Sequence, residues 1–399
     1  MVKRHLEDII QSHLFKRKTI LIYGARQVGK TTLVEELVRK QNTDSLMLNG
    51  DDADIRELFS NVSASKLRPV LGNYKLVVID EAQRITEAGL VIKIIHDNFK
   101  DIQLIVTGSS SLDLASKVKE PMTGRKLEFF LYPFSFSEMA DHHGYLTEKR
   151  LLETRMIFGY YPEVALNSGS ETQLIKTLAS DYLYKDLLSI GQIKKPALLD
   201  KILKALALQT GNEVSYHELA QLLDSDKGTI EKYIDMLEKA FIIFKLPGLS
   251  RNVRNEIKKG KKIYFYDNGI RNAVLGNFLP PGSRVDTGAL WENFLVSERL
   301  KLTANDEEVP GSYFWRTTQQ QEIDYIEEYQ DQLFAYEFKW NPSKKTSFSK
   351  TFSNAYPRSS FKVISPENMH EFLGGRNDGL TGQAEGTDRS VRGGVRQRR

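Results

Sequence analysis

The stretch ILIYGARQVGKTTLVEEL, from Ile20 to Leu37, decides the fold of the first part of this 399-residue chain. It begins as a β-branched, apolar run, which is typical of a buried strand, and it ends with apolar residues along one helical face. Between the two lies a loop that spells GxxxxGKT, from Gly24 to Thr31. At ordinary composition this pattern should occur by chance on the order of once per 100 chains of such length. A strand, a glycine loop and a helix in this order are the setting that a phosphate-binding loop requires.

The residue types of this loop suit a nucleoside triphosphate. Glycines allow backbone conformations that turn N–H groups toward phosphate oxygens, and the start of the helix adds a partial positive charge. Lys30 would reach the β- and γ-phosphates, and the Thr31 hydroxyl would ligate Mg²⁺. The alternative is a glycine turn that opens a surface helix, which the flanking strand and helix disfavour. The sequence therefore predicts that ATP and Mg²⁺ bind at Gly24, Ala25, Arg26, Gln27, Val28, Gly29, Lys30, Thr31 and Thr32.

A second apolar strand, in KLVVIDEAQRI (75–85), ends in two carboxylates. Open α/β sheets bind ligands at the C-terminal ends of their strands, so Asp80 is suited to hold Mg²⁺ through water. Glu81 is suited to polarise the attacking water, because hydrolysis needs an oriented nucleophile. On its own, this pattern would favour a strand that ends in a solvated acidic turn. The phosphate-binding loop earlier in the chain reverses that preference.

Two further positions carry open alternatives. A third strand, in IQLIVTGSSSL (102–112), ends in hydroxyl residues, and Thr107 or Ser109 would contact the γ-phosphate or the attacking water. Such hydroxyl clusters also cap helices, so both interpretations stand. Arg125 precedes a strand and is a candidate arginine finger that would complete the site of a neighbouring subunit. The alternative for Arg125 is a surface arginine that flanks a strand.

These motifs resemble those of prokaryotic AAA-type ATPases, whose sequences run GARQVGKTT, VVIDEAQ, VTGSSS, then GR and YPFSFSEM. The resemblance extends over about residues 15 to 373. Its C-terminal part is similar to an uncharacterised domain that is often fused to such ATPases and has a restriction-endonuclease-like fold. The resemblance implies ATP binding but no particular biological task.

The expected fold class is α/β, with a parallel sheet in a P-loop AAA-type domain and a second α/β domain of restriction-endonuclease-like fold. The expected parts, in chain order, are an ATP-binding domain (1–140), a helical lid (141–200), a winged-helix domain (201–270), a nuclease-like domain (271–373) and a disordered tail (374–399). In the lid, Arg155 is a weak candidate for a phosphate contact.

Composition limits the classes of function. The net charge is +4, and the tail alone holds six arginines against three acidic residues, so the remaining chain is nearly neutral. The chain has no cysteine, which excludes disulfides and thiolate metal sites and suits a reducing cytoplasm. No apolar run approaches the length of a membrane span, so no membrane partner is expected.

The charge distribution of the expected winged-helix segment indicates how the protein could bind nucleic acid. The third expected helix of this segment, at about 227–240, carries three lysines against three acidic residues, and Asp226 directly precedes it, which does not suit a DNA groove. Basic residues gather instead on the expected hairpin: Arg251, Arg254, Lys258, Lys259, Lys261 and Lys262, against Glu256. This predicts a clamp on the phosphate backbone of DNA or RNA that reads no bases. The alternative is a domain that packs protein against protein.

The last segment contains a possible second catalytic site. Glu292 lies in an amphipathic helix, Asp324 in the strand EIDYIEE, and Glu337 and Lys339 in the strand FAYEFKW. The period of a strand places Glu337 and Lys339 on one face. The order of these residues matches the restriction-endonuclease-like pattern, in which Asp324 and Glu337 would hold Mg²⁺ and Lys339 would orient or activate water, with support from Glu292. The alternative is a fold that has lost its activity and keeps these charges as an ion-pair cluster.

Together these features predict an ATPase switch in which ATP hydrolysis gates a Mg²⁺-dependent, nuclease-like domain that acts on nucleic acid. A homo-oligomer is expected if Arg125 acts on a neighbouring subunit. The rival prediction is an ATP-dependent module that binds DNA or protein and whose nuclease-like domain is catalytically inactive.

Overall fold

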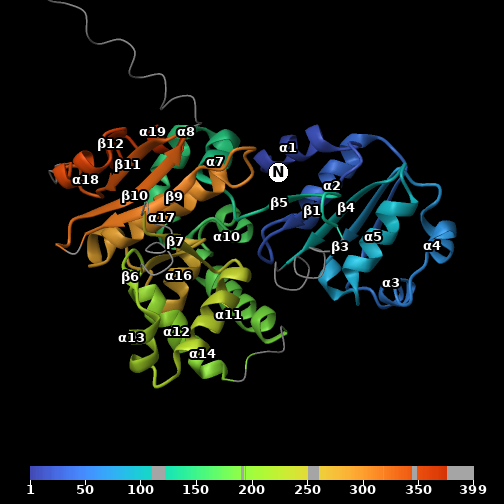
Figure 1. Cartoon of the computed structure of the whole chain (residues 1–399), viewed down its shortest axis with the longest axis horizontal. Helices are drawn as coiled ribbons and strands as arrows, with labels where there is room; N and C mark the ends of the chain where they lie inside the picture. Colours follow the sequence, from blue (N-terminus) through green and yellow to red (C-terminus); the bar gives the residue numbers. More distant parts are fainter. Residues whose placement is uncertain are drawn as a thin grey trace, which may run out of the picture.

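The computed structural model describes residues 1–109, 122–189, 193, 195–249, 260–317, 319–343 and 348–374, with the backbone alone described over 181–189. The described chain forms two lobes, one from residues 1–130 and one from the remainder (Figure 1). The predicted tail beyond Gly374 lies outside the described residues, as do hairpin residues 250–259. Among the described residues, no helix is both long enough and apolar enough to cross a membrane.

The first lobe is an α/β domain built on a five-stranded parallel sheet. The strands follow the spatial order β2-β3-β4-β1-β5. Three of them are buried over their whole length, which explains the near-continuous apolar sequence that each one carries. Their bounds are β1 (Thr19–Tyr23), β2 (Ser45–Asn49), β3 (Leu76–Asp80), β4 (Gln103–Gly108) and β5 (Lys126–Phe130). The helices of this lobe are α1 (His5–His13), α2 (Lys30–Gln41), α3 (Ala53–Leu58), α4 (Ala64–Leu71) and α5 (Ala88–Asn98), with a 3-10 turn, η1 (Ala82–Arg84).

The second lobe begins with five helices: α7 (Phe136–His143), α8 (Tyr145–Arg150), α9 (Leu152–Phe158), α10 (Pro162–Leu166) and α11 (Glu171–Ser189). Buried side chains of α7 and α9 share a core with a long helix near the C-terminal end, α17 (Thr287–Thr303). Arg155 does not reach a phosphate site. It is buried and bonded to Glu148, with 2.9 Å between Nε and Oε1, so this candidate is a structural residue.

Three helices and a three-stranded antiparallel sheet follow. They are α12 (Pro196–Leu208), β6 (Glu213–Val214), α13 (Tyr216–Leu222), α14 (Lys227–Lys239), β7 (Ile243–Pro247) and β8 (Lys261–Phe265), with sheet order β6-β8-β7. This order of elements is compatible with the expected winged helix. On α14, Asp235 and Glu238 both pair with Lys245 of β7. Part of the acidic charge expected to repel DNA is therefore neutralised inside the domain.

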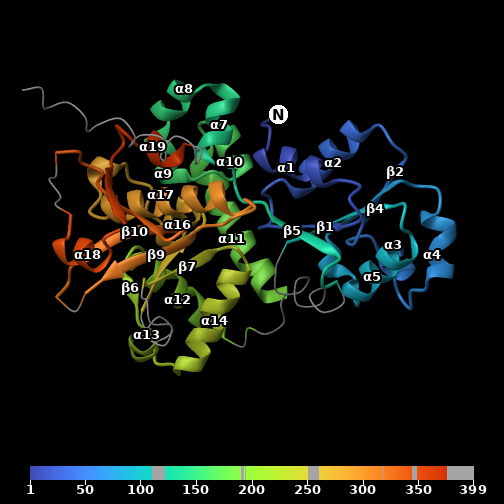
Figure 2. The ribbon, with the colours of Figure 1, turned by 45° about the horizontal axis from the view of Figure 1, so that its top comes forward.

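The C-terminal part is a mixed four-stranded sheet of order β12-β11-β10-β9. Its strands are β9 (Gly311–Arg316), β10 (Glu322–Tyr329), β11 (Gln332–Phe338) and β12 (Ser359–Ile364), and its short elements are α16 (Asn268–Leu275), η2 (Pro281–Ser283), α18 (Lys350–Ala355) and α19 (His370–Leu373). The expected meander of three strands corresponds to β9, β10 and β11. Helix α17 lies between this sheet and α9 (Figure 2), and side chains of all three share one core.

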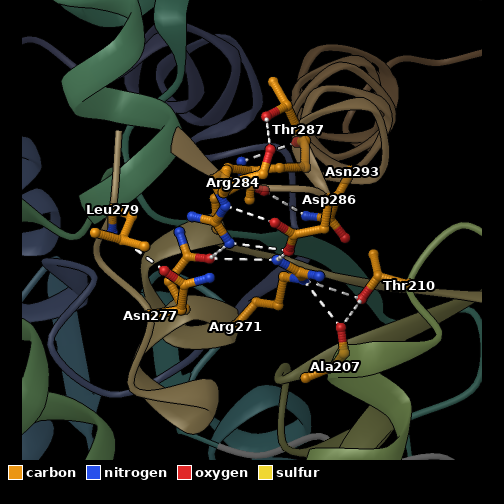
Figure 3. Close-up of polar contacts among 12 residues, drawn as sticks. Ala207, Thr210, Arg271, Asn277, Leu279, Arg284, Asp286, Thr287 and Asn293 are labelled. Atoms are coloured by element: carbon orange, nitrogen blue, oxygen red, sulfur yellow. Dashed lines mark hydrogen bonds and ion pairs between the residues drawn. The ribbon is translucent and has the colours of Figure 1, made fainter. Parts of the chain in front are cut away.

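A buried ionic network joins α12, α16 and the start of α17 (Figure 3). Arg271 donates to the backbone carbonyl of Ala207 (3.1 Å) and to the carboxylate of Asp286 (2.6 Å). Arg284 donates to the same carboxylate at 2.6 and 2.9 Å. One carboxylate thus serves two buried guanidinium groups. The network ties the expected winged-helix and nuclease-like segments into a single packed unit.

Candidate functional site

The loop after β1 has the shape of a phosphate cradle. Gly24 has no room for a side chain, because an ideal Cβ there would overlap the backbone carbonyl of Leu131. Gly29 has φ +92°, a left-handed conformation that favours glycine, and it precedes α2 without capping it through a side chain. Within the described part of the chain, no side chain caps the first turn of α2, and this is the place where the sequence predicts phosphate oxygens.

Lys30 is buried against this loop. Its Nζ donates to the carbonyls of Gly24 (3.0 Å) and Ala25 (2.8 Å), so the ammonium group is folded over the loop. Thr31 follows, and its hydroxyl donates to Oδ2 of Asp80 at 2.7 Å. The hydroxyl and the carboxylate that were predicted to flank Mg²⁺ are thus in direct contact. Of the other loop residues, Val28 and Ala25 are buried, whereas Gln27 and Thr32 are exposed and Arg26 is half-buried.

Three neighbouring strands bring the remaining predicted residues to the same edge. β4 lies between β1 and β3, so Thr107 stands beside Asp80 and donates to Oδ1 of that carboxylate. The backbone N–H of Glu81 donates to both side chains, at 3.1 Å to Asp80 and 3.2 Å to Thr107. Glu81 itself has φ 49°, a left-handed conformation that is uncommon for a residue with a side chain. This network ties the end of β3 to the end of β4.

Gln83 is a site residue that sequence analysis missed. Its amide nitrogen donates to the carboxylate of Glu81 and, at 2.8 Å, to the hydroxyl of Ser109. Gln83 therefore holds the expected water-polarising carboxylate against β4. The signal was present, because Gln83 lies two residues after Glu81 in the same motif. The sequence alone does not identify its role, because no spacing rule is known for a side chain that fixes a carboxylate and does not ligate a metal.

Arg125 lies at the opposite edge of the sheet. β5 runs parallel to β1 with Lys126 beside Thr19, so Arg125 is level with the start of β1, whereas the phosphate loop follows the end of β1. Five residues of strand separate these edges by about 15 Å. Arg125 pairs with Asp97 instead, with 3.4 Å between Nε and Oδ1. Within one chain Arg125 is therefore remote from the phosphate loop, and a contact with ATP would require a second copy.

A cavity of about 450 Å³ adjoins the loop on the side of α2. Gly29 and Thr32 form its wall at the loop. The rest of the lining is mixed: apolar residues Met1, Val2, Val28, Leu33, Phe134, Pro162 and Leu166, and charged residues Lys3, Arg4, Glu7, Glu36, Arg39 and Lys40. Sequence analysis missed this cavity, because its apolar lining comes from segments that are far apart in the chain and each looks like ordinary core. Its size, and the apolar part of its lining, suit a small planar group such as a nucleobase.

The C-terminal candidate residues also come together. β10 pairs with β11 so that Tyr325 faces Tyr336, which places Asp324 opposite Glu337. Oδ2 of Asp324 accepts a hydrogen bond from the N–H of Phe338 (2.8 Å), and Nζ of Lys339 donates to Oε2 of Glu337 (2.9 Å). Burial, followed by the carboxylate of Asp324, raises the pKa of Glu337 to about 7.

Glu292 joins this group from α17, but its partners were not predicted. Its Oε1 accepts bonds from Lys262 (3.0 Å) and Tyr264 (2.6 Å), both on β8. Burial raises the pKa of Glu292 to about 7, an effect that Lys262 opposes. Lys262 also contacts Glu322 at 2.6 Å. We call Glu292, Glu322, Asp324 and Glu337, with Lys262 and Lys339, the acidic cluster.

Lys262 corrects one expectation. Sequence analysis assigned it to a basic hairpin that contacts phosphate, but its side chain is only 1% exposed and lies inside the acidic cluster. Lys258 and Lys259, assigned to the same hairpin, lie outside the described residues. Among the residues that the structure describes, no three His, Asp or Glu side chains are arranged to hold one metal ion. A Mg²⁺ ion here would have at most two carboxylates and would keep several waters, which is a common arrangement for this ion.

Three family models match the chain. One described as an AAA domain matches residues 16–140, one described as a domain of unknown function (DUF8612) matches 149–280, and another domain of unknown function (DUF4143) matches 287–376. The first match covers most of the N-terminal lobe, whose parallel five-stranded sheet matches a P-loop AAA domain. The second match crosses the expected boundaries at 200 and 270. The third covers most of the expected nuclease-like segment and gives no activity for it.

Similar proteins exist in bacteria and archaea. An uncharacterized protein of Mycobacterium tuberculosis is 27% identical over 330 residues, which cover 82% of this chain and 71% of that protein. An uncharacterized protein of Methanocaldococcus jannaschii is 24% identical over 347 residues, covering 79% and 74%. Among solved structures, the RuvB Holliday junction branch migration motor of Thermotoga maritima is 16% identical, with a TM-score of 0.33, and covers 70% of this chain and 96% of that one. A TM-score this low carries no conclusion about this chain.

Proposed function

We propose that the N-terminal lobe binds ATP with Mg²⁺ and hydrolyses it, and that the nucleotide state controls how the second lobe is held. The observation that carries this proposal is the convergence of Lys30, Thr31, Asp80 and Thr107 at one edge of the sheet, beside a glycine cradle. A structural loop would have no need of an ammonium group folded over it or of a carboxylate bonded to the first turn of a helix.

Each side chain has a distinct part in this proposal. Lys30 attracts the β- and γ-phosphates, and Thr31 and Asp80 hold Mg²⁺, which would neutralise charge on the phosphate oxygens. Glu81, fixed by Gln83, orients the water that attacks the γ-phosphate. The cavity beside α2 takes the base. The donor set of hydroxyl and carboxylate oxygens is the chemistry that Mg²⁺ prefers.

The test separates binding from hydrolysis. Lys30→Ala should abolish tight ATP binding, whereas Glu81→Gln should bind ATP and hydrolyse it slowly, as measured by nucleotide binding and by phosphate release. Lys100→Ala and Asp101→Asn are matched controls, because both residues are exposed and precede β4, at the edge of the sheet opposite the loop. If both site variants release phosphate at the rate of the unsubstituted protein, the lobe is not an ATPase of this kind.

A second candidate function belongs to the acidic cluster. We infer that Asp324 and Glu337 hold Mg²⁺ and that Lys339 orients a water molecule, so that the C-terminal domain cleaves a phosphodiester bond in DNA or RNA. The observation that favours this function is the pairing of Asp324 with Glu337 on adjacent strands, with Lys339 on the second carboxylate. The rival is a binding module for DNA or protein, and Lys262 favours it by supplying the cluster with a cation of its own.

A cleavage assay decides between these two. Single- and double-stranded DNA and RNA are incubated with the protein and Mg²⁺ or Mn²⁺, with and without ATP. The nuclease function predicts cleavage that Asp324→Ala removes while ATP hydrolysis stays intact, because the two sites lie in different lobes. Asp331→Ala serves as a control on the exposed turn between the same strands. Absence of metal-dependent cleavage, with ATP hydrolysis present, supports the binding module.

A further inference from the structure

Arg4 links the phosphate loop to the second lobe from a buried position just before α1. Its side chain donates three hydrogen bonds to three separate segments. Nη1 donates to the carbonyl of Val28 (2.8 Å), Nη2 to the carbonyl of Tyr132 (2.7 Å) and Nε to Oε1 of Glu138 (3.0 Å). The guanidinium group lies over the ring of Phe134, 4.9 Å from its centroid. An arginine with only 8% exposure and this many partners is held in one orientation.

The bond to Val28 fixes the direction of a peptide group in the loop. Among the described residues no peptide bond is cis, and in a trans peptide the C=O and the following N–H point in opposite directions. Because Arg4 holds the carbonyl of Val28, the N–H of Gly29 points away from Arg4. The φ of +92° at Gly29 shows that this peptide lies where the loop turns into α2. Arg4 thereby prevents rotation of the Val28–Gly29 peptide and keeps the N–H of Gly29 in an orientation that could bind a phosphate oxygen.

The bond to Glu138 extends this control to the second lobe. Glu138 also accepts the N–H of Ser135 at 3.0 Å and so closes the capping box at the start of α7. Burial alone would raise the pKa of Glu138, but Arg4 and the backbone N–H groups of His5 and Ser135 lower it, so the carboxylate is charged. The N–H of the next residue, Phe136, donates to Glu298 of α17 at 2.6 Å. The start of α7 is therefore held by Arg4 on one side and by α17 on the other.

We propose that Arg4 is a positioning residue of the nucleotide site and that the Arg4–Glu138 pair is the joint through which the phosphate loop and α17 move together. The proposal rests on the proposed ATPase function. Arg4 donates its three side-chain hydrogen bonds to protein groups. It acts by keeping the Val28–Gly29 peptide in the orientation that binds phosphate, and the same guanidinium group transmits any rotation of that peptide to the start of α7.

The first test replaces the arginine with residues that lack its fork. Arg4→Lys keeps a positive charge for Glu138 but cannot reach two carbonyls at once. We expect it to raise the KM for ATP on the order of tenfold, the size of one lost hydrogen bond to a charged group, with a smaller effect on kcat. Arg4→Ala should show the same split, and millimolar guanidinium should partly restore its KM.

Arg68→Lys is the matched control. Arg68 is exposed in the same lobe and also lies over an aromatic ring, that of Phe99, so the same substitution there should leave KM unchanged. If the unsubstituted protein and Arg68→Lys hydrolyse ATP while Arg4→Lys keeps its KM, Arg4 does not position the loop, although the ATPase proposal stands. If no variant binds ATP and the unsubstituted protein does not either, it is the ATPase proposal that fails.

The second test addresses the joint. Glu138→Gln keeps the shape of the side chain and removes the charge that holds Arg4. Hydrogen exchange at the start of α7 should slow in the unsubstituted protein when the non-hydrolysable analogue AMP-PNP is added with Mg²⁺, and this response should be lost in Glu138→Gln and in Arg4→Lys. An unchanged response in both variants, with AMP-PNP bound, would overturn the coupling.

Discussion

At the scale of single residues, Lys262 shows how burial changes the meaning of a charge. In the sequence it stands among other basic residues and predicts contact with phosphate. In the structure it lies between Glu292 and Glu322. Burial alone would lower the pKa of Lys262, but the carboxylates of Glu292, Asp324 and Glu322 raise it above its ordinary value, so the ammonium stays charged. The alternation of side chains along the short strand β8 could not reveal which face of the strand α17 covers, and so could not reveal that Lys262 is buried.

Lys262→Met tests whether the acidic cluster depends on this cation. The change leaves two carboxylates without their buried partner, and such losses cost about 3 kcal/mol or more. We expect the free energy of unfolding to fall by that amount in chemical denaturation. Added Mg²⁺ should recover part of the loss, because a divalent ion would replace the ammonium. Lys261→Met, at the half-exposed neighbouring position, should change stability by less than about 0.5 kcal/mol.

At the scale of elements, α17 organises the second lobe. Asn293 bonds to both backbone groups of Phe265 on β8, at 2.7 and 3.0 Å. Glu298 holds the start of α7, and Arg299 forms a two-point ion pair with Glu327 of β10 at 2.7 and 2.8 Å. Sequence analysis expected an amphipathic helix with one important glutamate. The sequence could not show that polar residues on the remaining turns of α17 are buried too. A helix that is covered on several sides has no solvent-exposed face by which its polar residues could be recognised.

The start of α17 gives a prediction about pH. Burial alone would raise the pKa of Asp286, yet Arg284 and Arg271 hold it well below its ordinary value of 3.8. A carboxyl group whose pKa is lower in the folded chain stabilises the fold above its unfolded pKa and loses this effect as pH falls through the folded pKa. Asp286→Asn should therefore destabilise the protein by about 3 kcal/mol at pH 7, since it leaves two buried guanidinium groups unpaired.

Thermal unfolding over a pH series measures this effect. The difference between Asp286→Asn and the unsubstituted protein should be constant from neutral pH down to about pH 4 and should shrink below it. Asp101→Asn, at an exposed position, should show no such difference. A difference for Asp286→Asn that grows on acidification would contradict the sign of the pKa shift.

At the scale of the whole molecule, the sequence predicted the first lobe well and the second lobe incompletely. The phosphate loop, Asp80 and Thr107 were accessible because each ends a strand of one parallel sheet, where local sequence determines position. The cavity beside α2 and the contacts of Arg4 were not accessible, since both require segments that are far apart in the chain to meet. The restriction-endonuclease-like fold and the winged helix stay predictions.

The position of Arg125 leads to a prediction about assembly. In one chain it lies about 15 Å from the edge that carries the glycine loop, so as an arginine finger it would serve only a neighbouring copy. Arg125→Ala should then lower kcat on the order of 10³-fold with little effect on ATP binding. A mixture of Arg125→Ala and Lys30→Ala chains should regain activity, because one chain supplies the phosphate loop and the other supplies the arginine. Full activity of Arg125→Ala alone would show that assembly does not complete the site.

The close fit of Gly24 against Leu131 has a mechanical consequence. The chain passes from the first lobe to the second directly after β5, and there the N–H of Leu131 donates to the carbonyl of Tyr23 at 2.7 Å. The segment that connects the two lobes thus also packs against the phosphate loop. There is no free space between Gly24 and Leu131. A pulling force on the second lobe acts first on Leu131, which packs against the loop at Gly24, and then on the parallel sheet. Under the proposed function, a load borne by the second lobe would therefore act on the shape of the phosphate loop and on the affinity for ATP.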